Sequence, residues 1–109
     1  ISSAMTAISN DYGYDKVFAR EIEAIATKHD ILIAITTSGN STNVIKAVDA
    51  AICASIPVAV FTGEGKGKLS AKCSIINIPS NQTARIQECH ILIGHIICGL
   101  VEASIFGDK

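Results

Sequence analysis

A hydroxyl-rich turn is the part of this 109-residue sequence best suited to chemistry. The run Thr36-Thr37-Ser38-Gly39-Asn40-Ser41 carries four hydroxyl side chains among six residues. Hydroxyls donate to phosphate oxygens, and glycine lets the backbone approach an anion or adopt a positive φ. The run holds no lysine, which a transferred phosphoryl group generally needs to absorb its charge. We therefore expect a phosphate held as a fixed handle, with Thr36, Thr37, Ser38 and Ser41 as its ligands.

Helix capping is the simpler explanation of this turn, because Ser and Thr cap helices in most proteins. Capping would account for Ser41 alone, but not for a whole hydroxyl run placed after a buried strand. The sequence has neither the G-x-x-x-x-G-K-[ST] pattern of P-loops nor the G-x-G-x-x-G pattern of dinucleotide sites. A second glycine-rich stretch, 63–68, is interpreted as a mobile solvent loop that leads into a short helix at Leu69 and binds no ligand.

The elements that must position the turn follow an alternating pattern. Apolar, β-branched runs predict strands at 31–36, 57–62 and 74–79, the first buried on both faces. Helical spacing predicts helices from about Asp15, from Ser41 and over 83–105, and a short strand is possible at 5–8. The alternation indicates an α/β fold with a parallel sheet. Ligands of such sheets bind beyond the carboxyl ends of the strands, where the hydroxyl turn lies.

Composition limits the partners. Hydrophobic residues make up 49% of the chain and charged residues 17%, so we expect a partner to cover part of the surface. A net charge of −1 leaves no basic stripe for a nucleic-acid backbone, so nucleic acid is not expected as a ligand. We expect no apolar run of membrane-spanning length and find no signal-peptide pattern at the start, which favours a cytoplasmic protein without a membrane partner.

The cysteines indicate a reducing compartment. They stand at irregular spacings with no C-x-x-C pair, at Cys53, Cys73, Cys89 and Cys98. We expect free, buried thiols rather than a disulfide framework or a cysteine-rich zinc site.

Four motifs carry a family resemblance. The run 35–45, which contains the hydroxyl turn, resembles the phosphosugar-binding loop of the SIS (sugar isomerase) family. Three further motifs are Ser9-Asn10-Asp11-Tyr12-Gly13-Tyr14, then Phe61-Thr62-Gly63, then Ala84-Arg85-Ile86-Gln87-Glu88-Cys89-His90 followed by His95. Together and in this order they resemble the phosphoheptose isomerase group of that family over nearly the entire chain.

The resemblance implies an SIS-type, three-layer fold, with 1–109 as the C-terminal part of a single SIS domain that is incomplete at its N-terminus. It implies an isomerase that interconverts sedoheptulose 7-phosphate and D-glycero-D-manno-heptose 7-phosphate through an enediol, for ADP-heptose and lipopolysaccharide synthesis. It also implies a zinc ion and a homotetramer with sites at subunit interfaces. The family's Gly-Asn-Gly-Gly-Ser turn, and the helix with a metal-binding His and a catalytic Glu, have no counterpart here. We therefore expect these 109 residues alone to be inactive.

By resemblance, His95 is the catalytic acid or base, and it ligates zinc together with Gln87, which also contacts substrate. Without the resemblance, an inert histidine inside the apolar run 91–100 would be the better explanation. On an ideal helix, eight residues separate the two Cα atoms by about 12 Å of rise and about 80° of rotation. Asn10 and Asp11 are assigned to sugar hydroxyls by resemblance, although both also favour ordinary turns.

A non-catalytic binding protein is the alternative. Some SIS proteins sense sugar phosphates within regulators, and one bacterial relative of the heptose group associates with the replication initiator protein. The presence of both Gln87 and His95 favours catalysis.

Overall fold

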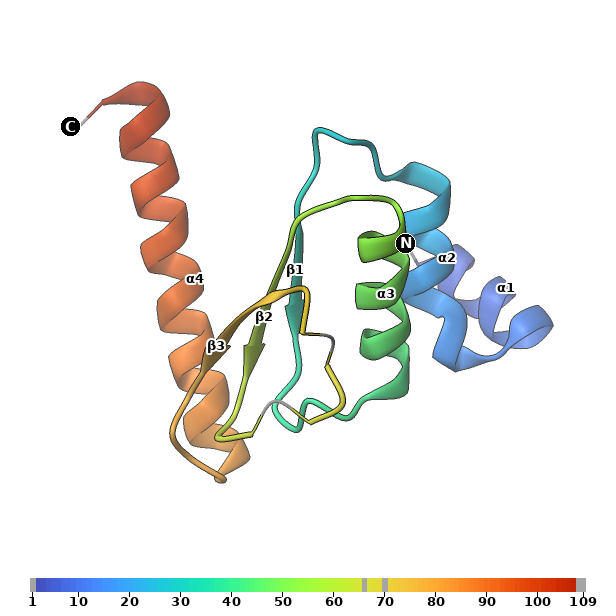
Figure 1. Ribbon diagram of the computed structural model, residues 1–109, viewed down its shortest axis with the longest axis horizontal. Helices are drawn as coiled ribbons and strands as arrows, with labels where there is room; N and C mark the ends of the chain where they lie inside the picture. Colours follow the sequence, from blue (N-terminus) through green and yellow to red (C-terminus); the bar gives the residue numbers. More distant parts are fainter. Residues whose placement is uncertain (1, 66, 70, 108–109) are drawn as a thin grey trace.

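The computed structural model describes residues 2–65, 67–69 and 71–107 (Figure 1). The elements are the helices α1 (Ser2–Tyr12), η1 (Tyr14–Lys16), α2 (Val17–Ile25), α3 (Thr42–Cys53) and α4 (Thr83–Phe106), and the strands β1 (Leu32–Ile35), β2 (Val58–Thr62) and β3 (Ser74–Asn77). The three expected strands and the three expected helices are all present, with shifts of a few residues at their ends.

Within the described residues the strands form a parallel sheet in the order β1-β2-β3. Ile35 at the end of β1 is in register with Phe61, and Phe61 is in register with Ile76 of β3. In Figure 1, α1, α2 and α3 lie on one side of the sheet and α4 on the other. The α/β, three-layer prediction is confirmed. Because the strands are parallel, their carboxyl ends meet at one edge, where a shared site can form.

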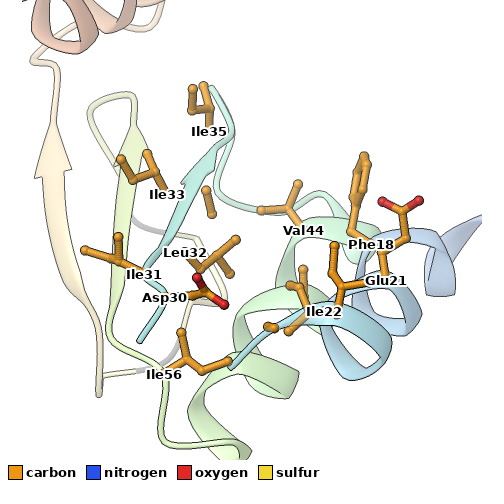
Figure 2. Close-up of a pocket in the computed structure, with 14 residues that line it drawn as sticks. Phe18, Glu21, Ile22, Asp30, Ile31, Leu32, Ile33, Ile35, Val44 and Ile56 are labelled. Carbon is orange, nitrogen blue, oxygen red and sulfur yellow. The ribbon is translucent and has the colours of Figure 1, made fainter. Parts of the chain in front are cut away.

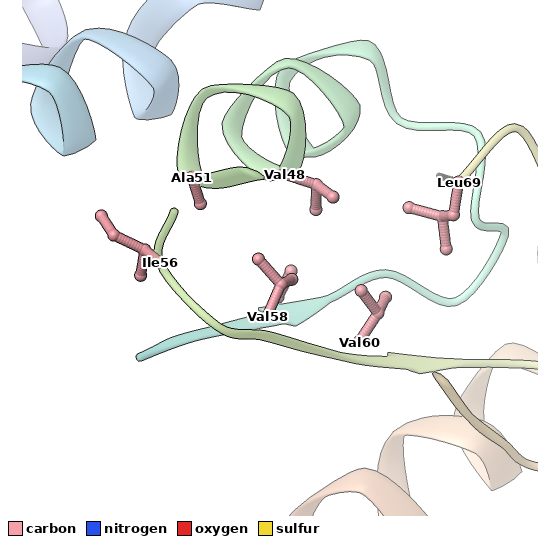
Figure 3. Close-up of a cluster of buried hydrophobic side chains, with 7 residues drawn as sticks. Val48, Ala51, Ile56, Val58, Val60 and Leu69 are labelled. Carbon is pink, nitrogen blue, oxygen red and sulfur yellow. The ribbon is translucent and has the colours of Figure 1, made fainter. Parts of the chain in front are cut away.

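The main core lies between α3 and the sheet. Val48 and Ala51 of α3 face Val58 and Val60 of β2 in Figure 3, and all four are buried. β2 is the central strand and its buried residues lie on both of its faces, as a near-continuous apolar run predicts.

A glycine-rich segment, 63–73, connects β2 to β3. Its described residues form bends and turns, so the short helix expected at Leu69 is wrong. Leu69 instead inserts its buried side chain into the core beside Val48 and Val60 (Figure 3). The buried Leu69 side chain therefore holds the β2–β3 connection against the core, whereas parallel strands are usually connected by a helix.

β1 is not buried on both faces, contrary to expectation. Leu32 faces Ile22 and Val44 of α2 and α3 in Figure 2, whereas Ile31 and Ile33 point to the other side. Ile33 is 44% exposed and Ile35 is 57% exposed. β1 is an edge strand in the described sheet, and the described helices cover mainly one of its faces. The apolar run therefore leaves exposed isoleucine side chains on the second face of β1.

The N-terminal segment is a helix, so the strand considered at 5–8 is wrong. Ala4, Met5 and Ala7 are strong helix formers, and the Thr6 hydroxyl bonds back to the Ser2 and Ser3 carbonyls. Gly13 ends the helix with a φ of 101°. A segment of four residues, three of them apolar, is too short to separate a strand period from a helical one.

α4 contacts the sheet mainly through its first turns, and its buried residues in the described structure are Ile86 and His90. The helix is long and apolar enough to cross a membrane by length and composition, and few of its residues are buried. The expectation that no apolar run reaches that length is therefore wrong. Many core and interface helices pass the same test, so it is weak evidence for a membrane.

No disulfide joins the cysteines in the described structure, as expected, but none of them is buried. Cys53 and Cys98 are exposed, and Cys73 and Cys89 are partly covered. Cys73 packs against the edge of the core, whereas Cys53 and Cys98 lie on exposed helix faces, where an apolar neighbourhood in sequence does not imply burial.

Candidate functional site

The hydroxyl turn forms a compact loop between β1 and α3. Thr36 is buried, and its Oγ1 accepts the Gly39 amide at 3.3 Å and lies 3.3 Å from Ser41 Oγ. Ser38 Oγ accepts the Asn40 amide at 3.1 Å. Gly39 has a φ of 70°, a region that glycine enters at little cost. The Thr36 hydroxyl thus shapes the loop from inside, while Ser38 and Ser41 are exposed on it.

The N-terminus of α3 opens directly onto this loop. Ser41 is the N-cap residue, yet its side chain makes no capping hydrogen bond. Its hydroxyl is directed to Thr36 instead. A helix start without a bond from its N-cap side chain presents amide donors and a partial positive charge to an anion, although the Val44 amide already donates to Asn43 Oδ1 at 2.9 Å. Phosphate binding by this loop stays a prediction, and this geometry suits it.

The glycine-rich stretch 63–68 packs against the hydroxyl loop through Gly67 and Lys68. The Lys68 amide donates to the Gly39 carbonyl at 3.2 Å. A Cβ on Gly67 would lie 2.3 Å from the Gly39 oxygen, so no larger residue fits there without displacement. Gly67 and Lys68 are exposed, as a solvent loop predicts, but their backbone also contacts the hydroxyl loop at Gly39. Lys66 lies outside the described residues.

A hollow of about 260 Å³ lies where the strand ends meet the start of α4. Thr37 and Ser38 line it from the hydroxyl loop. The residues that sequence reasoning missed there are Glu64, Ser80, Asn81 and Thr83. Glu64 follows β2 in the glycine-rich stretch expected to bind no ligand, and Ser80, Asn81 and Thr83 follow β3, where no motif marks them. Only the parallel pairing of the strands brings these residues to Thr37.

A groove of about 620 Å³ runs between α4 and the sheet, and both Gln87 and His95 line it. The two side chains therefore lie on the same side of α4, as an angular offset of about 80° predicts, although they are about 12 Å apart along the helix axis. Ile35 and Phe61 line its other side, immediately before Thr36 and Thr62. The groove therefore adjoins the hydroxyl loop at the carboxyl edge of the sheet.

Asn10 and Asp11 lie in the last turn of α1, not in a turn after a strand. Both are exposed, and the Asn10 amide donates to the Asp11 carboxylate at 2.9 Å. An ion pair of Asp15 with Lys46 ties the adjoining η1 to the N-terminal half of α3, the helix that the loop begins. Neither Asn10 nor Asp11 lines the hollow or the groove.

A zinc site is not complete within these side chains. In residues 2–65, 67–69 and 71–107, no three His, Cys, Asp or Glu side chains lie close enough to hold a metal ion. Gln87 and His95 supply at most two donors, whereas structural or catalytic zinc takes three or four from protein. A zinc ion held by Gln87 and His95 would therefore need further ligands from outside this chain, and zinc binding stays a prediction.

Residues 1–63 match the sequence profile of the family described as "SIS domain". This match covers more than half of the chain. The chain belongs to the SIS domain family. The hydroxyl loop lies inside the matched part, whereas Gln87 and His95 lie beyond it.

Relatives extend the likeness over α4. The chain is 52% identical over 102 residues to the phosphoheptose isomerase of Aliarcobacter butzleri and 46% identical over 105 residues to that of Rhodospirillum rubrum. These alignments cover 93% and 95% of this SIS chain, but 54% and 56% of the relatives. The chain therefore spans about half the length of the curated relatives it matches.

Solved structures agree with this likeness. The phosphoheptose isomerase of Neisseria gonorrhoeae matches with a TM-score of 0.87 at 45% identity, over 92% of this chain and 57% of that one. The enzyme of Francisella tularensis matches with the same TM-score at 35% identity, over 92% of this chain and 55% of that one. The arrangement of the sheet and its helices is that of these enzymes.

Proposed function

We propose that this SIS chain forms part of a phosphoheptose isomerase, which interconverts sedoheptulose 7-phosphate and D-glycero-D-manno-heptose 7-phosphate. The observation that carries the proposal is the groove shared by Gln87 and His95, which adjoins the hydroxyl loop at the carboxyl edge of the sheet. The isomerisation of a sugar phosphate needs both a site that holds the phosphate and a group that transfers a proton. The names of the curated relatives favour the isomerase over a regulatory sugar-phosphate binder.

The loop is the anchor in this proposal. Thr37, Ser38 and Ser41 donate to the phosphate together with the first amides of α3, while Thr36 holds the loop in shape. Asn10 and Asp11 contact sugar hydroxyls, and Gln87 holds a hydroxyl near the reacting carbons. Because the phosphate is only held, the absence of a lysine from the turn is consistent with its role.

His95 moves the proton. Isomerisation removes a proton from C1 of the ketose, passes through an enediol and returns a proton to C2, so it needs an acid and a base. His95 supplies one of the two from α4. The other, by resemblance a glutamate, is not among these 109 residues, so the proposed reaction requires groups beyond the chain.

Zinc is proposed as a cofactor that also requires groups from beyond this chain. Gln87 and His95 would hold it with ligands from outside this chain, and the ion would polarise the sugar carbonyl.

Assembly into a homotetramer would complete the sites. The exposed apolar residues of α4 include Ile91, Leu92, Ile96, Leu100, Val101, Ile105 and Phe106. Contiguous apolar surface of this kind marks an interface. Such an interface would cover α4 and bring further residues to the groove. The cytoplasm is the proposed location, because a phosphorylated sugar does not cross a bilayer unaided.

The test is turnover by the protein at its full natural length. Sedoheptulose 7-phosphate and unphosphorylated sedoheptulose are supplied separately, with and without a chelator, and the aldose is followed by NMR. The proposal expects turnover of the phosphate ester and a large loss without the phosphate. Binding of sedoheptulose 7-phosphate without turnover in any condition would instead establish the regulatory alternative.

A further inference from the structure

His90 is a buried polar residue that the proposed reaction does not use. It is 4% exposed and lies on α4 between Gln87 and His95. Its Nε2 is 2.9 Å from the Thr62 carbonyl oxygen. Because a carbonyl only accepts, Nε2 carries a hydrogen and donates it to Thr62. The His90 ring also contacts Phe61, with 5.8 Å between centroids.

Thr62, which accepts the hydrogen bond from His90, is followed by Gly63, and Gly63 bonds to the hydroxyl loop. The Gly63 amide donates to the Thr37 carbonyl at 3.1 Å. A Cβ on Gly63 would lie 2.7 Å from both that oxygen and Ile86 Cδ1. Gly63 is therefore clamped between the loop and the first turn of α4, and the absence of a side chain permits this approach.

His90 and Ile86 are the buried residues of α4 in the described structure. Both meet the sheet at the Thr62–Gly63 segment, so these contacts determine where the start of α4 lies relative to the loop. Gln87 and His95 are three residues before and five after His90, so their position follows from the same contacts.

We propose that His90 is a positioning residue, whose hydrogen bond to Thr62 holds α4 in register with the hydroxyl loop so that His95 faces a sugar anchored by its phosphate. The proposal rests on the function proposed above.

The Thr62 carbonyl makes a clean test possible. It also accepts the Ile78 amide at 3.1 Å, so removal of the His90 donor leaves it with a partner. Substitutions at His90 can then probe position without leaving a buried acceptor unpaired. His90→Gln retains an amide donor, and His90→Leu is of similar size without one.

Both variants are made in the protein at its full natural length. His90→Leu should lower kcat for sedoheptulose 7-phosphate by about 10- to 100-fold through displacement of His95, with little change in KM, since the anchor is intact. His90→Gln should recover most of kcat at a similar melting temperature. Equal kcat values in the two variants would overturn the proposal.

A second readout does not depend on catalysis. Hydrogen exchange at the Gly63 amide reports its bond to Thr37, and it should be faster in His90→Leu than in His90→Gln. Equal exchange overturns the proposal for His90. A wild-type protein that never isomerises the heptose overturns only the proposed function, and the exchange comparison still decides the role of His90.

Discussion

Thr36 and Ser41 face each other across the hydroxyl loop, with 3.3 Å between their side-chain oxygens. The buried Thr36 oxygen also accepts the Gly39 amide, whereas Ser41 is exposed at the start of α3. Two hydroxyls of one motif therefore have different surroundings, and they should respond differently to substitution.

Thr36→Val should lower the free energy of unfolding by about 1–3 kcal/mol, because the buried Gly39 amide loses its acceptor. Ser41→Ala should cost less stability and mainly weaken phosphate binding, because it removes an exposed donor. Urea denaturation and titration with inorganic phosphate measure the two effects. Equal losses of stability in both variants would contradict the internal role of Thr36.

Gly67→Ala should disturb the hydroxyl loop from outside. Gly67 has a φ of 56°, which costs another residue about 1–2 kcal/mol, and its Cβ would meet the Gly39 carbonyl. The variant should lower both stability and phosphate affinity. Gly65→Ala is the matched control, since nothing lies within 4 Å of its Cβ. A Gly67→Ala variant that binds phosphate as Gly65→Ala does would show that the contact is not needed.

The ion pair of Asp15 and Lys46 should make the free energy of unfolding depend on pH in the acidic range. The hydrogen bond from Lys46 lowers the pKa of Asp15 below its ordinary value of 3.8. A lowered folded pKa stabilises the fold above pH 3.8, and this contribution is lost as the pH falls through the folded pKa.

Asp15→Asn should therefore be less stable than wild type at neutral pH, and the difference should shrink below pH 3.8. Chemical denaturation as a function of pH measures it, with Asp49→Asn, an exposed carboxylate on α3, as the control. A difference that stays constant down to pH 2, on the order of two units below the ordinary pKa, would count against the pair.

The sequence was informative where one local pattern decides the outcome. The apolar run of β2 predicted a buried strand, and the hydroxyls after β1 predicted a loop at the carboxyl edge of the sheet. Local pattern did not decide Met5–Ile8, where four residues suit both a strand and a helix. It did not reveal Ser80 or Asn81 either, because their place beside Thr37 depends on how β1, β2 and β3 pair.

The central claim separates an anchor from a proton-transfer group, and one kinetic comparison tests it most directly. In the protein at its full natural length, His95→Asn and Ser38→Ala are compared with wild type for kcat and for the Kd of sedoheptulose 7-phosphate. His95→Asn should lower kcat by about 10²- to 10⁴-fold with Kd little changed, whereas Ser38→Ala should mainly raise Kd. A His95→Asn variant that keeps wild-type kcat would contradict the account.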